Sequence, residues 1–451
     1  MLCRLICRPS SRRLILFFAG WAMDADVFSA LHRPGYDVAV VWDYAEAGKL
    51  PDFGNDYDEI CVVAWSLGVA AASVPLPFEN KVTRRIAIAG TPNPVDDNEG
   101  IPRALFEATR KAVSAQGMVR FYRRMAGGAS AAAPFMTKAP RRTIESLCAE
   151  LDVFLTPLPA GAPTARWDMA IITGRDAIFP AANQRRAWRH TPTIELDSPH
   201  LVDFQAIIDR FIVDKDYAGE RFAHRRASYE AAAPVQTEMC ELMARFINSQ
   251  SLPEGEIVEA GCGTGLLSRR LDHSGRNLLL WDIADSDIAI PGARFRQCDA
   301  ETAIRELADN SVAAVVSAST VQWFNSPVRF FENCRRVLRP GGILSIGTYT
   351  AGNLGEVAAA TGVSLELPSP EGWAGMLPDG LELIDMRSYR RRLTFDSAAG
   401  VFRHLSATGV NSLNRERSAA TLRHALAAMP CGADGLFGAT YHPCIFHAIK
   451  R

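Results

Sequence analysis

Two segments of the sequence each carry an apolar strand into a turn of small residues, and together they require two separate α/β cores. Residues 61–69 read Cys-Val-Val-Ala-Trp-Ser-Leu-Gly-Val, and residues 256–266 read Glu-Ile-Val-Glu-Ala-Gly-Cys-Gly-Thr-Gly-Leu. Both patterns are typical of a buried strand that ends at a chemically active loop. The 451 residues exceed the usual size of one core, so we expect two domains of roughly 200 residues each.

The composition is that of an ordinary soluble protein, with 48% hydrophobic and 22% charged residues and a net charge of -1. Such a charge gives no overall attraction to nucleic acid or to a membrane. The ten cysteines lie among apolar runs without paired metal-ligand spacing. We therefore expect no metal site and a cytoplasmic protein with reduced thiols. The first 20 residues only faintly resemble a signal peptide, and no run reaches transmembrane length.

The N-terminal half alternates short apolar runs with helical patterns, which predicts a parallel sheet with crossover helices. Within it, residues 64–68 fit the nucleophile elbow Gly-x-Ser-x-Gly, with alanine in the first small position. Asp176 lies just past one expected strand and His200 just past the next. This order is that of α/β-hydrolases, so we predict that His200 takes a proton from Ser66 and that Asp176 orients the ring. The expected strands are 14–18, 38–42, 59–64, 86–89, 169–173 and 193–196.

Alternatives remain for single members of this triad. A serine at such a turn can simply cap the following helix, and Asp197 and Asp203 are rival acids. The oxyanion donors should be backbone N–H groups. We expect one from Leu67, directly after the serine, and one from Trp21, at the end of the first strand.

A long helical insertion, a lid, is expected between about residues 90 and 167. In residues 102–143, nine basic residues stand against one acid, Glu107. A solvated helix face is the ordinary explanation of such a run. In a chain of nearly zero net charge, however, so one-sided a segment predicts an acidic partner.

Several segments of this half together resemble the BioG family, esterases that remove the methyl ester from pimeloyl-acyl carrier protein in biotin synthesis. They are Phe-Phe-Ala-Gly-Trp, Val-Ala-Trp-Ser-Leu-Gly-Val, Ala-Gly-Thr-Pro-Asn-Pro-Val-Asp, Gly-Ile-Pro and Asp-Ala-Ile-Phe-Pro-Ala-Ala-Asn-Gln. The resemblance covers about residues 1–213. It implies an α/β-hydrolase esterase with a helical lid, the roles given above for Ser66, Asp176, His200 and Trp21, and acidic acyl carrier protein as the partner. It assigns no individual arginine.

The pattern restarts with a helix over residues 218–248, broken near Pro234, so we expect domains 1–213 and 214–451. The expected strand 256–260 leads into a loop in which Glu259, Gly261, Gly263 and Gly265 form Glu-x-Gly-x-Gly-x-Gly, the S-adenosylmethionine loop of class I methyltransferases. Its last glycine falls earlier than in a dinucleotide fingerprint. The alternative is a purely structural glycine turn. A helix is expected over 264–271.

Two acids follow at the ends of the next strands. Asp282 ends the expected strand 277–282 and is suited to hold both ribose hydroxyls. Asp299 ends 294–299 and is placed to accept from the adenine amino group. A single acid there is usually a turn residue, but two at these distances after the loop support a cofactor site. Further strands are expected at 312–317, from 343 and from 441.

The same half resembles the BioC family, malonyl-acyl carrier protein methyltransferases that start biotin synthesis. The resemblance spans about residues 216–451 and rests on residues 217–236, on Ala-Ser-Thr-Val-Gln-Trp at 318–323 and on residues 404–413. Ser406 stands where a lysine is expected. The implied fold is a class I, Rossmann-like methyltransferase with S-adenosylmethionine as the methyl donor.

The nucleophile would be a carboxylate, already ionised at neutral pH, so alignment rather than a general base should drive the transfer. We expect a buried cation to hold its second oxygen, with Arg226 as a weak candidate and Arg329 in reserve; the ordinary explanation of both arginines is a solvated side chain. Tyr229 is expected to close the cofactor pocket, or else to be a core tyrosine, and Trp323 is a further substrate-site candidate.

The sequence thus predicts a bifunctional enzyme that methylates malonyl-acyl carrier protein and later hydrolyses the methyl ester of pimeloyl-acyl carrier protein. Nucleic acid and membranes are not expected partners. One alternative is a generic carboxylesterase fused to a small-molecule methyltransferase, such as a quinone methylase. Another is a carrier-protein scaffold in which one site has decayed, although both sets of site residues are intact.

Overall fold

The computed structural model describes residues 1–9, 11–46, 50–156, 164–362, 365–408 and 419–451. These residues divide into two compact units, Met1–Ile212 and Val213–Arg451. Each unit has its own seven-stranded sheet with buried apolar layers against it. In these ranges, no helix combines the length and the apolar character needed to cross a bilayer.

The sheet of the first unit has the strand order β1-β3-β2-β4-β5-β6-β7. Neighbouring strands are parallel except for β1, which runs antiparallel to β3 at the edge. From the sequence, no strand is expected at residues 2–7. In the structure β1 forms the sheet edge, and its residues are partly buried or exposed. The strands are β1 (Leu2–Cys7), β2 (Arg13–Phe18), β3 (Asp37–Trp42), β4 (Glu59–Trp65), β5 (Val82–Ile88), β6 (Met169–Thr173) and β7 (Thr193–Leu196).

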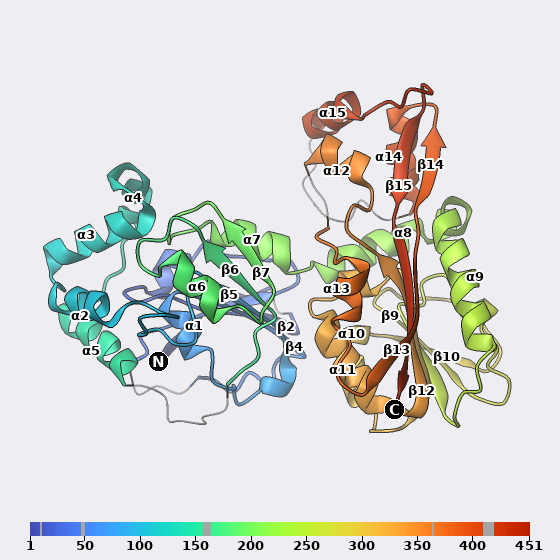
Figure 1. The fold of residues 1–451 in the computed structure, drawn as a ribbon, viewed down its shortest axis with the longest axis horizontal. Helices are drawn as coiled ribbons and strands as arrows, with labels where there is room; N and C mark the ends of the chain where they lie inside the picture. Colours follow the sequence, from blue (N-terminus) through green and yellow to red (C-terminus); the bar gives the residue numbers. More distant parts are fainter. Residues whose placement is uncertain (10, 47–49, 157–163, 363–364, 409–418) are drawn as a thin grey trace. The chain divides into compact units, whose positions relative to one another are not determined.

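A helical insertion lies between β5 and β6, as the sequence predicts, and Figure 1 shows it gathered at one side of this unit. Two of its helices, Arg103–Lys111 and Ala115–Ala126, are strongly amphipathic, and Phe121, Tyr122 and Met125 of the second join the core. The insertion contains α2 (Arg103–Lys111), α3 (Ala115–Ala126), α4 (Ala129–Met136) and α5 (Ile144–Leu155); the other helices are α1 (Leu67–Ala71), α6 (Ala181–Ala187) and α7 (Phe204–Phe211).

The sheet of the second unit has the strand order β10-β9-β8-β11-β12-β16-β13. The first five strands are parallel, and β16 runs antiparallel to both of its neighbours. The order reverses between β8 and β11, the kind of position where open α/β sheets bind their ligands. The strands are β8 (Glu256–Ala260), β9 (Leu278–Asp282), β10 (Ala293–Gln297), β11 (Val312–Ala318), β12 (Leu338–Tyr349), β13 (Leu381–Ser388) and β16 (Pro443–Lys450).

Helices cover both faces of this sheet, and a small two-stranded sheet stands at one end of the unit (Figure 1). The prediction of a helix over residues 264–271 is wrong. The segment contains turns and the short 3-10 helix η3 (Ser268–Arg270), because Gly265 is left-handed at φ 86° and Leu271 is extended. The remaining α-helices and β-strands of the described residues are α8 (Lys215–Ala232), α9 (Pro234–Asn248), α10 (Ala300–Ala303), α11 (Pro327–Val337), α12 (Gly355–Thr361), α13 (Pro370–Ala374), α14 (Ala398–Ala407), α15 (Ala419–Ala428), β14 (Arg391–Phe395) and β15 (Phe437–Tyr441).

Two candidate active sites

Ser66 occupies the sharp turn between β4 and α1, with φ 59° and ψ -128°. A non-glycine residue rarely adopts positive φ, and this strain is characteristic of a nucleophile elbow. The turn also requires a small residue two positions later. A Cβ atom on Gly68 would lie 2.4 Å from the carbonyl oxygen of Phe18.

The structure brings Ser66, His200 and Asp176 into one hydrogen-bonded chain. His200 Nε2 lies 2.9 Å from Ser66 Oγ, and His200 Nδ1 lies 2.8 Å from Asp176 Oδ2. An ionised carboxylate can only accept, so the Nδ1–H donates to Asp176 and Nε2 accepts from the serine hydroxyl. The histidine is therefore in the form that can remove the serine proton.

Asp176 is held firmly for this role. Its Oδ1 accepts from the backbone N–H groups of Ile178 and Phe179, at 2.7 and 2.9 Å. Its Oδ2 accepts from the Thr173 hydroxyl at 2.7 Å and from the Gln184 amide at 3.1 Å. The rival acids are engaged elsewhere, because Asp197 pairs with Arg175 and Asp203 caps α7.

The two predicted oxyanion donors lie beside the serine. Trp21 and Leu67 line the same cavity as Ser66, with about 350 Å³ of empty space. Leu67 is the first residue of α1, where N–H groups have no intrahelical partner. Within the described residues, the backbone N–H of Trp21 and that of Leu67 donate no hydrogen bond.

The rest of this cavity comes mainly from the helical insertion and is mostly apolar, which suits an acyl chain. Arg124, to which the sequence gives no individual role, is its one lining cation among the described residues. Its guanidinium donates to Thr109 Oγ1 at 3.4 Å, and burial lowers the pKa of Arg124. The apolar lining residues are Ile101, Leu105, Phe106, Phe121, Leu151 and Ile178.

The nine basic residues of the insertion do not form one surface. Arg142 is buried against Asp43 and Glu150, and Arg110 pairs with Asp152. The predicted basic face therefore consists of fewer side chains than the sequence suggests. Its exposed members are Arg103, Lys111, Arg120, Arg123, Lys138 and Arg141.

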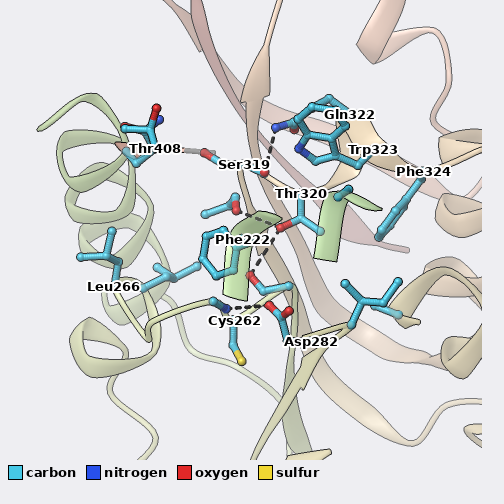
Figure 2. Close-up of a pocket in the computed structure, with 18 of the residues that line it drawn as sticks. Phe222, Cys262, Leu266, Asp282, Ser319, Thr320, Gln322, Trp323, Phe324 and Thr408 are labelled. Atoms are coloured by element: carbon cyan, nitrogen blue, oxygen red, sulfur yellow. Dashed lines mark hydrogen bonds between the residues drawn. The ribbon is translucent and has the colours of Figure 1, made fainter. Parts of the chain in front are cut away.

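The second unit contains a larger cavity, with about 1370 Å³ of empty space, at the carboxyl ends of its parallel strands. Figure 2 shows Asp282 and Cys262 at one end and Ser319, Gln322, Trp323 and Thr408 towards the other. Among the residues predicted for this site, Glu259, Gly261, Gly263, Asp282, Asp299, Tyr229 and Trp323 line it.

The glycine-rich loop closes one wall of this cavity. Gly261 and Gly263 have φ of 77° and 55°. A Cβ atom on Gly261 would overlap Thr320 at 2.1 Å, and one on Gly263 would meet Phe222 at 3.0 Å. The third glycine, Gly265, shapes the loop but does not line the cavity.

The acids of this cavity fit a ligand rich in donors. Asp282 accepts from the N–H groups of Gly263 and Ala284, at 2.8 and 2.9 Å, and its remaining lone pairs suit ribose hydroxyls. Glu259 accepts from Ser268 at 2.6 Å, and burial raises the pKa of Glu259 to about 8. Gln236 Oε1, buried in the cavity wall, has no hydrogen-bond partner among the described residues. These residues fit S-adenosylmethionine, which brings hydroxyl and ammonium donors.

Asp299 has a partner that the sequence does not reveal. Its Oδ2 lies 2.7 Å from Lys215 Nζ, and its Oδ1 accepts from the N–H of Glu301. Lys215 lines the cavity, is buried, and also pairs with Glu301 at 2.7 Å. It lies at the domain boundary, outside every motif, so no sequence signal marks it.

The structure does not bring Arg226 to this cavity. Its guanidinium donates to the carbonyl oxygen of Asp285 and lies 3.7 Å from Asp287, in a separate shallow hollow. Arg329, on α11, is not among the lining residues either. Thr408 lines the cavity, whereas residues 409–413 of the expected BioC segment lie outside the described residues.

Comparison with known proteins assigns both halves. Residues 4–208 match the family described as pimeloyl-ACP methyl esterase BioG, and residues 258–346 match a methyltransferase domain family. A malonyl-[acyl-carrier protein] O-methyltransferase of Bacteroides fragilis is 32% identical over 469 residues, covering 99% of this chain and 94% of its own. This chain belongs to the malonyl-[acyl-carrier protein] O-methyltransferase family. The predicted fusion of BioG and BioC is confirmed.

Shorter relatives match one half at a time. A malonyl-[acyl-carrier protein] O-methyltransferase of Haemophilus influenzae is 31% identical over 251 residues, covering 52% of this chain and 95% of its own. The crystal structure of BioG from Haemophilus influenzae is 27% identical, covers 45% of this chain and 94% of its own, and has a TM-score of 0.41. The second unit is a Rossmann-like methyltransferase domain.

Proposed function

We propose that this chain makes a methyl ester at one site and cleaves a methyl ester at the other. The second unit methylates the free carboxylate of malonyl-acyl carrier protein with S-adenosylmethionine as donor. The first unit, an α/β-hydrolase whose helical insertion forms a lid, hydrolyses the methyl ester of pimeloyl-acyl carrier protein. The observation that carries this proposal is the Ser66–His200–Asp176 chain inside the BioG-matched residues of a protein whose full length matches a methyltransferase.

Ester hydrolysis follows from the geometry of the first site. His200 Nε2 takes the hydroxyl proton as Ser66 Oγ bonds to the ester carbon, and the N–H groups of Trp21 and Leu67 stabilise the negative oxygen. His200 then gives that proton to the methoxide oxygen as the carbon–oxygen bond breaks, and methanol leaves. Water repeats the sequence on the acyl-serine and frees the carboxylate.

Methyl transfer requires alignment rather than proton transfer. S-adenosylmethionine supplies an electrophilic methyl carbon on a positively charged sulfur. Asp282 would hold the ribose hydroxyls, Glu259 and the glycine-rich loop would fix the amino-acid end, and Asp299 would face the adenine. The apolar rings of Phe222 and Phe324 line the cavity and would exclude water from it once the ligands are bound.

The two reactions explain each other. A methyl cap turns a charged acyl end into an apolar one, which chain-elongating enzymes can accept, and removing the cap later restores the charge. We therefore propose that the chain is a biotin-precursor enzyme that works in the cytoplasm with acyl carrier protein as its partner. The match to BioG over residues 4–208 favours this assignment over a generic carboxylesterase.

Mass spectrometry of the carrier protein tests the proposal. Malonyl-acyl carrier protein incubated with S-adenosylmethionine and the Ser66→Ala variant should gain one methyl group. The methyl ester of pimeloyl-acyl carrier protein should lose one with wild-type protein and none with Ser66→Ala. Equal activity on free malonate or on quinols, without the carrier protein, would favour the small-molecule alternative.

A further inference from the structure

A buried ion cluster joins the helical insertion to Asp43, directly after the carboxyl end of β3. Arg142 Nη1 lies 2.6 Å from Glu150 Oε2, and Arg142 Nη2 lies 2.8 Å from Asp43 Oδ2. The three side chains are only 5%, 0% and 8% exposed for Arg142, Glu150 and Asp43. Burying such a cluster costs solvation energy, so stability alone is a weak reason for its presence.

The cluster reaches the turn that carries the Trp21 N–H. Glu150 Oε2 accepts from the N–H of Ala22 at 3.4 Å, and Arg142 donates to the carbonyl oxygen of Met23 at 3.4 Å. Directly before these two residues, the indole N–H of Trp21 donates to the Leu147 carbonyl oxygen at 2.9 Å. Three consecutive residues of the turn are thus held by hydrogen bonds to α5 and to Arg142, which lies just before this helix.

A second arm of the cluster reaches the same turn through Tyr44. The N–H of Tyr44 donates to Glu150 Oε1 at 3.3 Å, and the Tyr44 hydroxyl donates to the carbonyl oxygen of Ala19 at 2.6 Å. The turn belongs to no helix or strand, and Ala22 is left-handed at φ 66°. Because a strained conformation persists only where its surroundings impose it, these contacts set the direction of the Trp21 N–H.

We propose that Glu150, paired with Arg142, which Asp43 also anchors, positions the oxyanion turn of the esterase site. Glu150 is a positioning residue, since it acts on the reacting oxygen only through the backbone of Trp21 and Ala22. An oxyanion donor is effective only when it points at the oxygen of the tetrahedral intermediate. The insertion is then part of the catalytic machinery as well as a cover. This inference rests on the proposed esterase function.

The test compares binding of a tetrahedral adduct with binding of the substrate. Glu150→Ala and Glu150→Gln are compared with Asp152→Asn, which removes an exposed carboxylate from the same helix. An alkylboronic acid forms a tetrahedral adduct on Ser66 and needs no carrier protein. For Glu150→Ala we expect kcat and boronate affinity to fall together by about 100-fold, the order of loss for one oxyanion donor, with KM nearly unchanged.

Glu150→Gln keeps an acceptor oxygen for Ala22 and should lose about tenfold, while Asp152→Asn should match the wild type. Thermal unfolding shows whether the first unit is folded, and methyl transfer by the second unit of the same chain reports the amount of protein in the assay. The proposal is overturned if kcat of Glu150→Ala stays within about twofold of the wild type, or if KM rises while kcat and boronate affinity do not change. If Glu150→Ala does not fold, Glu150→Gln decides. A boronate dissociation constant about tenfold higher than that of the wild type, with KM nearly unchanged, supports the proposal, and an unchanged dissociation constant overturns it. Failure of wild-type protein to cleave the pimeloyl ester, with boronate binding retained, would instead count against the proposed function.

Discussion

The two sites differ in what completes them. In the first unit, each predicted catalytic group bonds to another group of the chain, from Ser66 to His200 to Asp176. In the second unit, the predicted groups face a cavity instead of one another. The polar groups of its wall either pair with a neighbour, with which a ligand would compete, or have no hydrogen-bond partner in the described part of the chain. Asp299 pairs with Lys215, and Gln236 Oε1 has no partner among the described residues.

This difference reflects the two reactions. Hydrolysis needs a proton relay, and a relay is built from side chains that touch one another. Methyl transfer to a carboxylate needs only a shaped receptacle, whose polar groups are satisfied by the cofactor and the substrate. The hydrolase site can therefore be recognised from internal distances, whereas the transferase site is recognised from its loop and its acids.

The comparison is tested most severely by Ser66→Ala. The variant should lose ester hydrolysis by about 10⁶-fold in kcat, because nothing else in the relay can attack the ester carbon. Methyl transfer should be unchanged, since Ser66 and the cofactor cavity belong to different units. Initial rates with both carrier-bound substrates measure this. Residual hydrolysis above about one per cent would mean that the triad is assigned wrongly.

The second test removes an acceptor from the receptacle. Asp282→Ala should weaken S-adenosylmethionine binding by about ten- to a hundredfold, since a hydrogen bond to a charged acceptor contributes roughly 1.5–3 kcal/mol. It also releases the N–H of Gly263, which Asp282 now fixes. Calorimetric titration gives the affinity, and intact esterase activity is the control. Unchanged affinity would exclude Asp282 from the site.

Most of the fold could be predicted because its strands are continuous apolar runs between recognisable turns. The failures have physical causes. β1 is a half-buried edge strand, and β14 with β15 forms a small separate sheet without an apolar run. The helix predicted after the glycine-rich loop fails because Gly265 is left-handed.

The candidate sites could be predicted where chemistry fixes spacing along the chain. Ser66, Gly261 and Asp282 belong to local patterns. Lys215 and Arg124 belong to none, because they reach their cavities only through the packing of helices distant in sequence. Arg226 illustrates the converse: a basic residue in the right segment, turned towards Asp285 and Asp287 instead of the cavity.

The basic face of the insertion gives a third, smaller effect. Arg120→Glu, Arg123→Glu and Lys138→Glu, all exposed, should together lower kcat/KM for the carrier-bound ester about tenfold at low salt and flatten its salt dependence. Hydrolysis of a small free methyl ester should survive.

The matched control makes the same charge change in the second unit, with Arg390→Glu, Arg403→Glu and Arg423→Glu, also exposed. Stopped-assay rates at several salt concentrations compare the two triple variants. Equal losses on free and carrier-bound esters would indicate a misfolded insertion rather than lost docking.

The smallest effect concerns the charge of Glu259. Burial raises the pKa of Glu259 to about 8, so the carboxyl group is mostly neutral at pH 7. A carboxyl pKa raised by folding means that the free energy of unfolding falls as pH rises from about 4.5 towards 8. A cationic cofactor favours the ionised form, so binding at pH 7 should release part of a proton. Affinity should rise roughly fivefold to tenfold between pH 7 and pH 8.5.

Calorimetry in buffers of different ionisation enthalpy measures the proton release directly. Glu259→Gln is the matched control, because it keeps an acceptor for Ser268 and cannot titrate. The variant should bind more weakly and lose most of the pH dependence, leaving only the titration of the cofactor's own amino group. The same proton release from Glu259→Gln as from wild type would show that Glu259 is not the group that ionises. The carboxyl group of Glu259 would then keep its protonation state when the cofactor binds, and this end of the cavity would be preformed, as the Ser66–His200–Asp176 relay is.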